Sequence, residues 1–192
     1  MIIDVKILQT DILSDSKYLL KNVTYEYSKD DGSKHQQIWE VYDRGGAAVI
    51  LLYNKDKKTV ILTQQFRLTT FINGNKTGML IEACAGMLDG DTPEACAIRE
   101  TEEETGYKIT AVQKIFEAYM SPGSLTEKLY FFVAEYNNAL KVSEGGGLAE
   151  EQENIEVLEL HIDTALQMIN SGEIEDAKTI MLLQYAKLNG IL

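Results

Sequence analysis

Acidic residues are concentrated in one short segment of this chain, over residues 86–107. The second half of the segment reads Arg99-Glu-Thr-Glu-Glu-Glu-Thr-Gly106. On a helix, Glu100 and Glu104 lie one turn apart and Glu103 lies beside them. Like charges at this spacing repel one another, so a bound cation would convert an unfavourable interaction into a favourable one. Carboxylate oxygens bind hard divalent cations, which activate water and polarise phosphoryl groups. The cluster therefore indicates metal-dependent chemistry on phosphates.

The residues around the acidic cluster predict the helix that carries it. Thr92 suits an N-cap, Pro93 suits the first helical position, and Gly106 suits the residue that ends a helix. At about 100° per residue, one face of this helix carries side chains able to pack on a core, namely Ala97, Ile98, Thr101 and Thr105. A glutamate-rich helix is more often a solvated surface than a metal site. The spacing of the carboxylates alone therefore leaves both interpretations open.

The charge of the chain limits its partners. Its 192 residues carry a formal net charge of −12, which argues against binding to a nucleic-acid backbone or to an anionic membrane surface. A phosphate substrate would also be repelled unless its site were locally positive. Arg44 and Arg67 stand at the edges of strand-like segments, where a guanidinium can hold a phosphate with two hydrogen bonds. Ordinary surface ion pairs are the alternative for both, whereas Arg99 is placed to orient the carboxylates of the cluster.

The composition is that of an ordinary globular protein, with 45% hydrophobic and 25% charged residues. Its length suffices for one domain with a small extension, and for a sizeable core. No apolar run is long enough to span a bilayer, and the N-terminus lacks a signal-peptide pattern. Cys84 and Cys96 have no CxxC spacing, so we interpret them as reduced core thiols that support neither a disulfide nor zinc. We therefore expect a cytoplasmic protein.

Apolar patterns along the chain predict mainly strands. The N-terminal part carries two or three strands over residues 3–28, a turn over 29–33 and a strand over 35–42. Further strands are predicted over residues 47–53, 59–66, 79–85, 109–118, 128–135 and 155–160, with helices over 163–171, capped by Asp163, and 176–188. Loops are predicted over 71–78, 119–127 and 140–154, the last of them flexible and acidic. This order indicates an α+β fold around a mixed sheet.

The segment over residues 86–107 resembles the Nudix box. That pattern has a glycine, a glutamate after five residues and Arg-Glu after seven more. An apolar residue, any residue, Glu-Glu, any residue, a glycine and a last apolar residue follow. The matching residues are Arg99, Glu100, Glu103, Glu104 and Gly106. The loop after Gly86 is one residue short, and Asp91 stands where the family has its first glutamate. Thr101 and Tyr107 stand at the two apolar positions.

The resemblance extends over nearly the full chain. Short stretches are similar to the ADP-ribose and GDP-mannose pyrophosphatase branch of the Nudix hydrolases, namely Val-Tyr-Asp-Arg44-Gly, Gln-Gln-Phe-Arg67, Leu-Ile-Glu82-Ala-Cys-Ala-Gly86, Ser-Pro-Gly123 and the Gly-Gly-Gly tract before Ile155-Glu-Val. This implies a Nudix α/β/α sandwich with a mixed sheet over residues 44–192, preceded by a small N-terminal antiparallel sheet over residues 1–43. It also implies a homodimer that exchanges the N-terminal sheet between subunits and shares the active site.

The reaction that the resemblance implies is Mg²⁺-dependent hydrolysis of the pyrophosphate bond of a nucleoside diphosphate sugar. GDP-mannose, giving GMP and mannose 1-phosphate, is the first expectation. ADP-ribose, giving AMP and ribose 5-phosphate, is the alternative. A third interpretation is a non-catalytic acidic module that binds Ca²⁺ or a protein partner, and the presence of all three box glutamates argues against it.

The family pattern also implies a role for each matching residue. The metal ligands would be the carbonyl of Ala85 with Glu100, Glu104 and Glu153, and Glu103 would be a further or bridging ligand. Glu151 would act as general base on a mobile loop that closes over the substrate, with Glu127 as the rival base. The phosphates would be held by Arg44 and Arg67, with Gly123 among the substrate contacts. Tyr18, Tyr42 and Phe71 are candidates for stacking on the base, although aromatic residues near strands more often belong to a core. The structural residues of the box would be Gly86, Arg99 and Gly106.

Overall fold

The computed structural model describes residues 1–148, 150 and 152–192. Contacts within this part of the chain define two compact units, an N-terminal unit of residues 1–46 with 119–128 and a second unit of residues 47–118 with 129–192. The 119–128 loop belongs to the N-terminal unit because it bonds to the backbone around Tyr42, whose N–H donates to the Ser124 carbonyl at 2.8 Å. The division of the chain at residues 43 and 44 stays a prediction.

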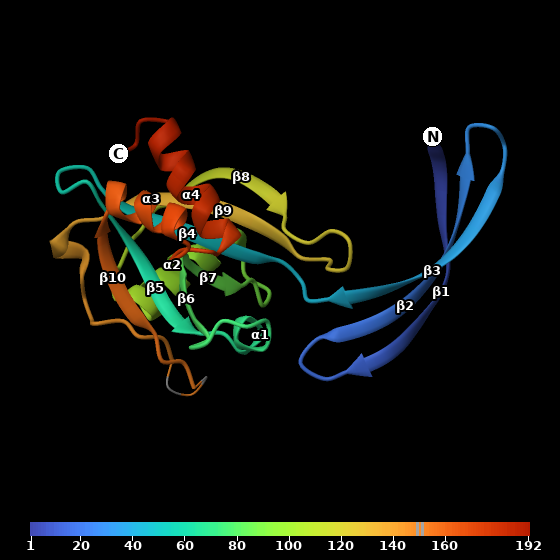
Figure 1. Ribbon diagram of the computed structural model, residues 1–192, viewed down its shortest axis with the longest axis horizontal. Coiled ribbons are helices and arrows are strands. Elements are labelled where there is room, and N and C mark those ends of the chain that lie inside the picture. Colours follow the sequence, from blue (N-terminus) through green and yellow to red (C-terminus); the bar gives the residue numbers. More distant parts are fainter. Residues whose placement is uncertain (149, 151) are drawn as a thin grey trace. The chain divides into compact units, whose positions relative to one another are not determined.

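The N-terminal unit is a small antiparallel sheet, as the sequence predicts (Figure 1). Its strands, in the spatial order β1-β2-β3, are β1 (Ile2–Asp15), β2 (Leu19–Lys29) and β3 (Lys34–Asp43). The turn between β2 and β3 is closed by Gly32, which has a φ of +80°, a backbone conformation that glycine adopts at little cost. In this register Val23 lies opposite Trp39.

The second unit is built on a mixed sheet. Its strands are β4 (Ala47–Asn54), β5 (Thr59–Phe66), β6 (Met79–Glu82), β7 (Cys84–Met87), β8 (Gln113–Tyr119), β9 (Lys128–Glu135) and β10 (Glu156–His161). The described strands follow the order β10-β5-β4-β9-β8, while β6 pairs with β5 and β7 pairs with β4. Because β4 and β9 run parallel and β4 and β5 run antiparallel, the sheet is mixed.

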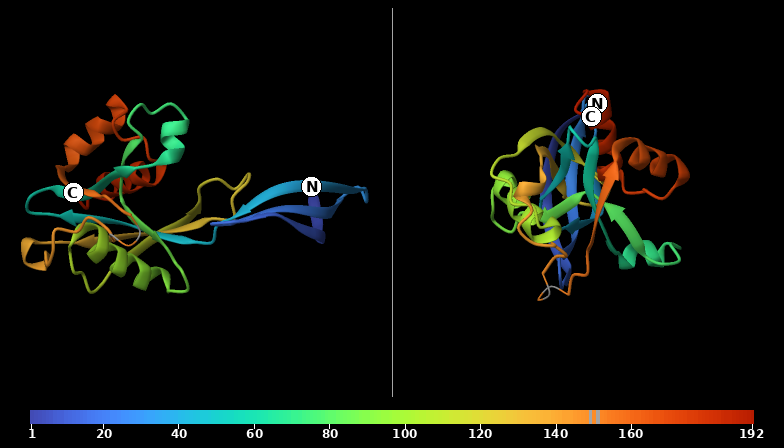
Figure 2. Two further views of the ribbon diagram at one scale, coloured as in Figure 1. Left: turned by 90° about the horizontal axis from the view of Figure 1, so that it is seen from below. Right: turned by 90° about the vertical axis from the view of Figure 1, so that its left-hand side faces the viewer.

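Helices cover both faces of this sheet. They are α1 (Leu68–Ile72), α2 (Pro93–Thr105), α3 (Ile162–Ser171) and α4 (Ala177–Leu188), with a 3₁₀ turn at Asn138–Leu140. Figure 2 shows α2 against one face and both α3 and α4 against the other. The expected α/β/α sandwich is therefore confirmed. Among the helices that the structure describes, none is long and apolar enough to cross a membrane.

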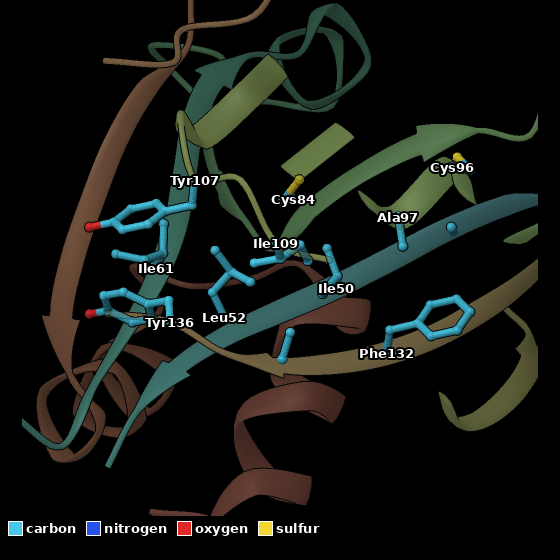
Figure 3. Close-up of a cluster of buried hydrophobic side chains, with 12 residues drawn as sticks. Ile50, Leu52, Ile61, Cys84, Cys96, Ala97, Tyr107, Ile109, Phe132 and Tyr136 are labelled. Atoms are coloured by element: carbon cyan, nitrogen blue, oxygen red, sulfur yellow. The ribbon is translucent and has the colours of Figure 1, made fainter. Parts of the chain in front are cut away.

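Strand β4 lies at the centre of the core. Its apolar run is buried on both faces, as expected for a strand sandwiched between two helical layers. On the α2 side, Ile50 and Leu52 join a cluster with Ala97, Phe132 and Tyr136 (Figure 3). Cys84 and Cys96 lie in the same cluster and are both free and buried, which confirms their interpretation as core thiols.

Some elements differ from the sequence-based expectation. The strand predicted over residues 79–85 is two strands, because β6 pairs with β5 and β7 pairs with β4, with Ala83 between them. The loop predicted over 71–78 begins inside α1, and the strand predicted over 109–118 begins only at Gln113. Helix α3 is capped by His161, whose Nδ1 accepts from the Asp163 N–H at 3.3 Å, so Asp163 is not the cap.

Candidate active site

Helix α2 has the boundaries that the sequence predicts. The Thr92 hydroxyl accepts a hydrogen bond from the Ala95 N–H at 3.2 Å, and Pro93 occupies the first turn. Gly106 adopts a φ of +75° and ends the helix, with its N–H donating to the Glu102 carbonyl. The acidic cluster is therefore held on a well-capped helix.

The packed face of α2 includes one of the carboxylates. Ala97, Thr101 and Thr105 are buried as expected, and the Thr101 hydroxyl donates to the Ala97 carbonyl at 2.7 Å. This internal hydrogen bond satisfies the hydroxyl and lets threonine occupy an apolar position of the box. Glu104 is also buried, with only 3% of its surface exposed, whereas Ile98 is only partly buried.

Glu104 points at the strand that precedes the box. Its Oε2 accepts a hydrogen bond from the Ala85 N–H at 3.3 Å. Burial raises the pKa of Glu104 to about 8, and the charges of Glu100 and Glu153 contribute to the increase. Burial also raises the pKa of Glu100, and the charges of Glu103 and Glu153 act in the same direction. Glu100, Glu104 and Glu153 therefore lie close enough to repel one another.

Gly86 is required by the position of Glu100. A Cβ atom at residue 86 would overlap the Glu100 carboxylate, so the carboxylate occupies space that only glycine leaves open. The preceding residue, Ala85, lies in β7 beside the same carboxylates. The glycine of the box thus lets a backbone segment and an acidic side chain approach each other closely.

Arg99 connects the acidic side chains of the box. Its Nη1 lies 2.8 Å from Glu100 Oε1 and 2.9 Å from Glu103 Oε2, and its Nε lies 3.2 Å from Asp91 Oδ2. Asp91 therefore takes part in the box as a partner of Arg99. These contacts place Arg99 among the carboxylates, and its role in orienting them stays a prediction.

The glycine tract after β9 docks on the C-terminal end of α2. The Gly146 N–H donates to the Glu104 carbonyl at 2.9 Å, and the Gly147 N–H donates to the Glu103 carbonyl at 3.1 Å. These bonds satisfy carbonyls that a helix end otherwise leaves unpaired. Glu153 follows the tract, and its Oε2 accepts from the Leu148 N–H at 3.0 Å. This part of the predicted flexible loop is therefore tied to the box, while Glu151 lies outside the described residues.

The carboxylates are gathered but not arranged around one point. Across the described residues, no group of three or more His, Cys, Asp or Glu side chains is placed to hold a metal ion as it stands. The available donors are nevertheless of the right kind, since carboxylate oxygens and a backbone carbonyl suit Mg²⁺. The assignment of Ala85, Glu100, Glu103, Glu104 and Glu153 as ligands stays a prediction.

The N-terminal unit brings together a second set of predicted residues. Arg44 Nη1 lies 3.0 Å from Glu127 Oε1, so the predicted phosphate-binding arginine pairs with the rival base. The Arg44 guanidinium lies 5.5 Å from the centroid of the Tyr18 ring, which packs edge-on against Tyr42 at 5.7 Å. Arg44 Nε is buried and has no hydrogen-bond partner among the described residues. The carbonyl of Gly123 accepts from Trp39 Nε1 at 2.7 Å.

Arg67 belongs to a charged network in the second unit. Its Nε lies 2.6 Å from Glu82 Oε2, while Lys178 Nζ lies 2.5 Å from Glu82 Oε1 and 2.8 Å from Asp176 Oδ1. Glu82 has 3% of its surface exposed, so a buried carboxylate holds two cations in place. The contact of Lys178 with Glu82 could not be predicted from the sequence, because nothing local to α4 indicates that it meets β6. Phe71 is half exposed.

Comparisons with known proteins match both the N-terminal part and the rest of the chain. The NUDIX domain model matches residues 43–183, and the model described as GDP-mannose pyrophosphatase NudK N-terminal domain matches residues 4–42. A GDP-mannose pyrophosphatase of Klebsiella pneumoniae is 50% identical over 192 residues, covering 100% of this chain and 96% of the relative. A GDP-mannose pyrophosphatase of Yersinia pestis is 52% identical over 189 residues, covering 98% and 94%.

A solved structure shows a similar fold. The crystal structure of an ADP compounds hydrolase superposes with a TM-score of 0.74 at 17% identity, covering 100% of this chain and 99% of that one. At this identity the likeness concerns the fold alone. The NUDIX model matches most of the sequence, including the helix that carries the carboxylates. The chain therefore belongs to the Nudix hydrolase family.

Proposed function

We propose that the protein hydrolyses the pyrophosphate bond of GDP-mannose and releases GMP and mannose 1-phosphate, with Mg²⁺ as cofactor. The observation that carries this proposal is the group of mutually repelling carboxylates Glu100, Glu104 and Glu153 beside Ala85, on the helix of a Nudix box. The substrate follows from the names of the full-length relatives at about half identity.

The metal would be held by Glu100, Glu104, Glu153 and the Ala85 carbonyl, with Glu103 as a further ligand. Mg²⁺ there would polarise the phosphoryl group and activate water. The carboxylates repel one another in the metal-free protein. A bound cation would replace this repulsion by attraction between the metal and each carboxylate. Arg99 holds Glu100 and Glu103, so it limits how far these side chains turn when they bind the metal.

The diphosphate would be bound by Arg44 and Arg67. Each is anchored by a carboxylate, Arg44 by Glu127 and Arg67 by Glu82, and this fixes the orientation of each guanidinium. The buried Nε of Arg44 has no hydrogen-bond acceptor among the described residues. An oxygen of a bound phosphate would be a suitable acceptor for it. Tyr18, Tyr42 and Phe71 would then stack on the base, with Gly123 in the loop beside Trp39.

Glu151 is our proposal for the general base. Glu127 is the weaker candidate because it is paired with Arg44, and protonation of a carboxylate weakens such a pair. We expect Glu151→Gln to lower kcat strongly, on the order of 10²–10⁴-fold. Full turnover in Glu151→Gln together with loss of turnover in Glu127→Gln would assign the base to Glu127.

A homodimer is the other part of the proposal. Large apolar side chains on the N-terminal sheet are exposed, including Ile3, Val5, Ile7, Ile12, Ile38 and Trp39. Val23, Tyr25, Gln37, Trp39 and Val41 also line a groove of about 370 Å³ on this sheet. An apolar surface of this kind is normally covered by a partner, so we propose that a second subunit packs on it. Light scattering that gives the mass of one 21.5 kDa chain would refute the dimer.

The activity is tested by product analysis. We expect Mg²⁺-dependent release of GMP and mannose 1-phosphate from GDP-mannose, abolished by a chelator. A higher kcat/KM for ADP-ribose would keep the mechanism and change the substrate. Failure to hydrolyse either compound would favour the non-catalytic acidic module. The buried, free thiols of Cys84 and Cys96 support the cytoplasm as its location.

A further inference from the structure

The chain changes its partner strand immediately before the acidic cluster. Strand β6 pairs with β5, and β7, which follows it, pairs with β4. Ala83 lies between the two strands and has 1% of its surface exposed. Ala85, whose carbonyl is proposed to bind the metal, follows two residues later. The direction of the chain at Ala83 is therefore passed on to the backbone that borders the carboxylates.

Two threonine side chains hold the peptide group that joins Glu82 to Ala83. The Thr63 hydroxyl donates to the Glu82 carbonyl at 3.3 Å, and the Thr179 hydroxyl accepts from the Ala83 N–H at 2.6 Å. Both threonines are fully buried. A buried backbone group needs a hydrogen-bond partner, and at this change of strand side chains supply it. One of them comes from β5 and the other from α4.

The Thr179 hydroxyl is itself fixed by the N-cap of α4. It donates to Asp176 Oδ2 at 2.5 Å, and the same oxygen accepts from the Thr179 N–H at 2.9 Å. A hydroxyl has only one hydrogen, so a hydroxyl that donates to Asp176 must act as an acceptor toward Ala83. The cap therefore directs the lone pairs of Thr179 at the Ala83 N–H.

The preceding residue of α4 contacts the same segment through an ion pair. Lys178 Nζ lies 2.5 Å from Glu82 Oε1. Two consecutive residues of α4, Lys178 and Thr179, therefore hold two consecutive residues of the chain, Glu82 and Ala83. These contacts fix the first turn of α4 against the point at which β6 ends.

The other end of this segment meets the carboxylate cluster. The Ala85 N–H donates to Glu104 Oε2 at 3.3 Å, and in the pairing of β7 with β4 Ala85 lies opposite Val49. Pairing with β4 restrains one edge of β7, but it does not set the angle at which the chain leaves β6. The contact between Thr179 and Ala83 supplies that second restraint.

We propose that Thr179 is a positioning residue for the metal site, because its hydroxyl holds the Ala83 N–H and thereby orients the Ala85 carbonyl toward the cation. Thr179 itself would touch neither metal nor substrate. The inference rests on the proposed function, since it takes Ala85 as a metal ligand. It gives α4 a part in metal binding, although that helix carries none of the proposed ligands. Groups that orient metal ligands in this way typically change metal affinity or activity by about 10–100-fold when they are mutated.

Calorimetric titration with Mg²⁺ tests this role without any substrate. Thr179→Val keeps the shape of the side chain and removes the hydroxyl, so the dissociation constant of Mg²⁺ should rise about tenfold. Thr179→Ser keeps the hydroxyl and should recover most of the affinity. An unchanged dissociation constant in Thr179→Val overturns the proposal, and so does a Thr179→Ser variant that binds Mg²⁺ as weakly as Thr179→Val.

Thr59→Val is the matched control for a general loss of stability. The Thr59 hydroxyl also bonds to other side chains, those of Tyr136 and Glu159, but it lies at the end of β5 that does not pair with β6. Urea unfolding should show that Thr59→Val and Thr179→Val are both less stable, while only Thr179→Val binds Mg²⁺ more weakly. Equal weakening of Mg²⁺ binding in the two variants would assign the effect to stability and overturn the positioning role.

A second variant carries the test if Thr179→Val does not fold. Asp176→Ala leaves Thr179 in place and removes the acceptor that directs its hydroxyl hydrogen, so it should also weaken Mg²⁺ binding. Unchanged binding in a folded Asp176→Ala variant contradicts the proposal. The titrations need no turnover and so separate this inference from the proposed activity. If Mg²⁺ binding responds as expected and GDP-mannose is not hydrolysed, the activity is wrong and the positioning role stands. If the unmodified protein does not bind Mg²⁺, the positioning role is wrong.

Discussion

Helix α2 and the N-terminal sheet differ in how much of their side-chain surface is buried. On α2, Ala97 and Thr101 are fully buried and position the carboxylates at the edge of the core. On the sheet, Ile3, Val5 and Ile7 each have more than half of their surface exposed. The first region completes its packing within one unit, whereas the second leaves a surface for another molecule. The difference teaches that the proposed metal ligands on α2 are positioned within one unit, whereas the exposed side chains of the sheet are available to the second subunit that we propose.

The largest effect is expected from a change within α2. Glu104→Gln should lower kcat on the order of 10³-fold, because an amide cannot replace a carboxylate as a Mg²⁺ ligand. The fold should survive, since burial raises the pKa of Glu104 to about 8 and the metal-free protein therefore already accommodates a neutral side chain at pH 7. Steady-state kinetics with saturating Mg²⁺ and a thermal melt check both statements. Glu102→Gln, on the exposed side of the helix, is the control and should retain activity.

A change in the N-terminal unit should act on binding instead. Arg44→Ala should raise KM by about 10–50-fold, and its effect on the affinity for Mg²⁺ should be small. Arg44→Lys should recover little, because an ammonium cannot reproduce the two-point contact of a guanidinium. If Arg44→Ala weakens Mg²⁺ binding as strongly as Glu104→Gln does, the separation of roles between the two regions is wrong.

The boundaries of the box helix could be predicted from the sequence, whereas the ion-pair networks around it could not. The boundaries of α2 follow from Thr92, Pro93 and Gly106 because caps and stops act over a few consecutive residues. The pairing of Lys178 with Glu82 joins residues that are 96 positions apart, and no local pattern encodes that contact. Long-range pairs of this kind form only when the layers of the fold have packed.

The glycine tract shows the same limit. Its composition predicts a flexible loop, yet positive φ angles at Gly145, Gly146 and Gly147 shape it to bond with the end of α2. The glycines serve as a close-fitting connection because a side chain at Gly145 would overlap the helix backbone. Flexibility and close approach require the same residue type, so the sequence alone could not separate them.

The affinity for Mg²⁺ should depend on pH because of the carboxyl group of Glu104 on α2. Below a pH of about 8 the metal-free protein holds a proton on Glu104, and Mg²⁺ must displace it. The apparent affinity for Mg²⁺ should therefore rise about 50-fold between pH 6 and 8 and level off above about pH 9. Calorimetry in buffers of different ionisation enthalpy would show the released proton. The same dependence should be absent from Glu104→Gln.

The smallest effect is expected where the glycine tract meets α2. Gly145→Ala should lower the free energy of unfolding by about 2 kcal/mol, of which about 1 kcal/mol comes from the positive φ. The remainder comes from overlap between the new Cβ and the Glu104 carbonyl. Gly172→Ala is the matched control, because Gly172 has a φ of +80° and open space around its Cα. Equal losses in the two variants, measured by urea unfolding, would show that the tract does not pack tightly on the helix. A larger loss for Gly145→Ala, together with weaker Mg²⁺ binding, would show that the tract holds Glu153 beside the other carboxylates.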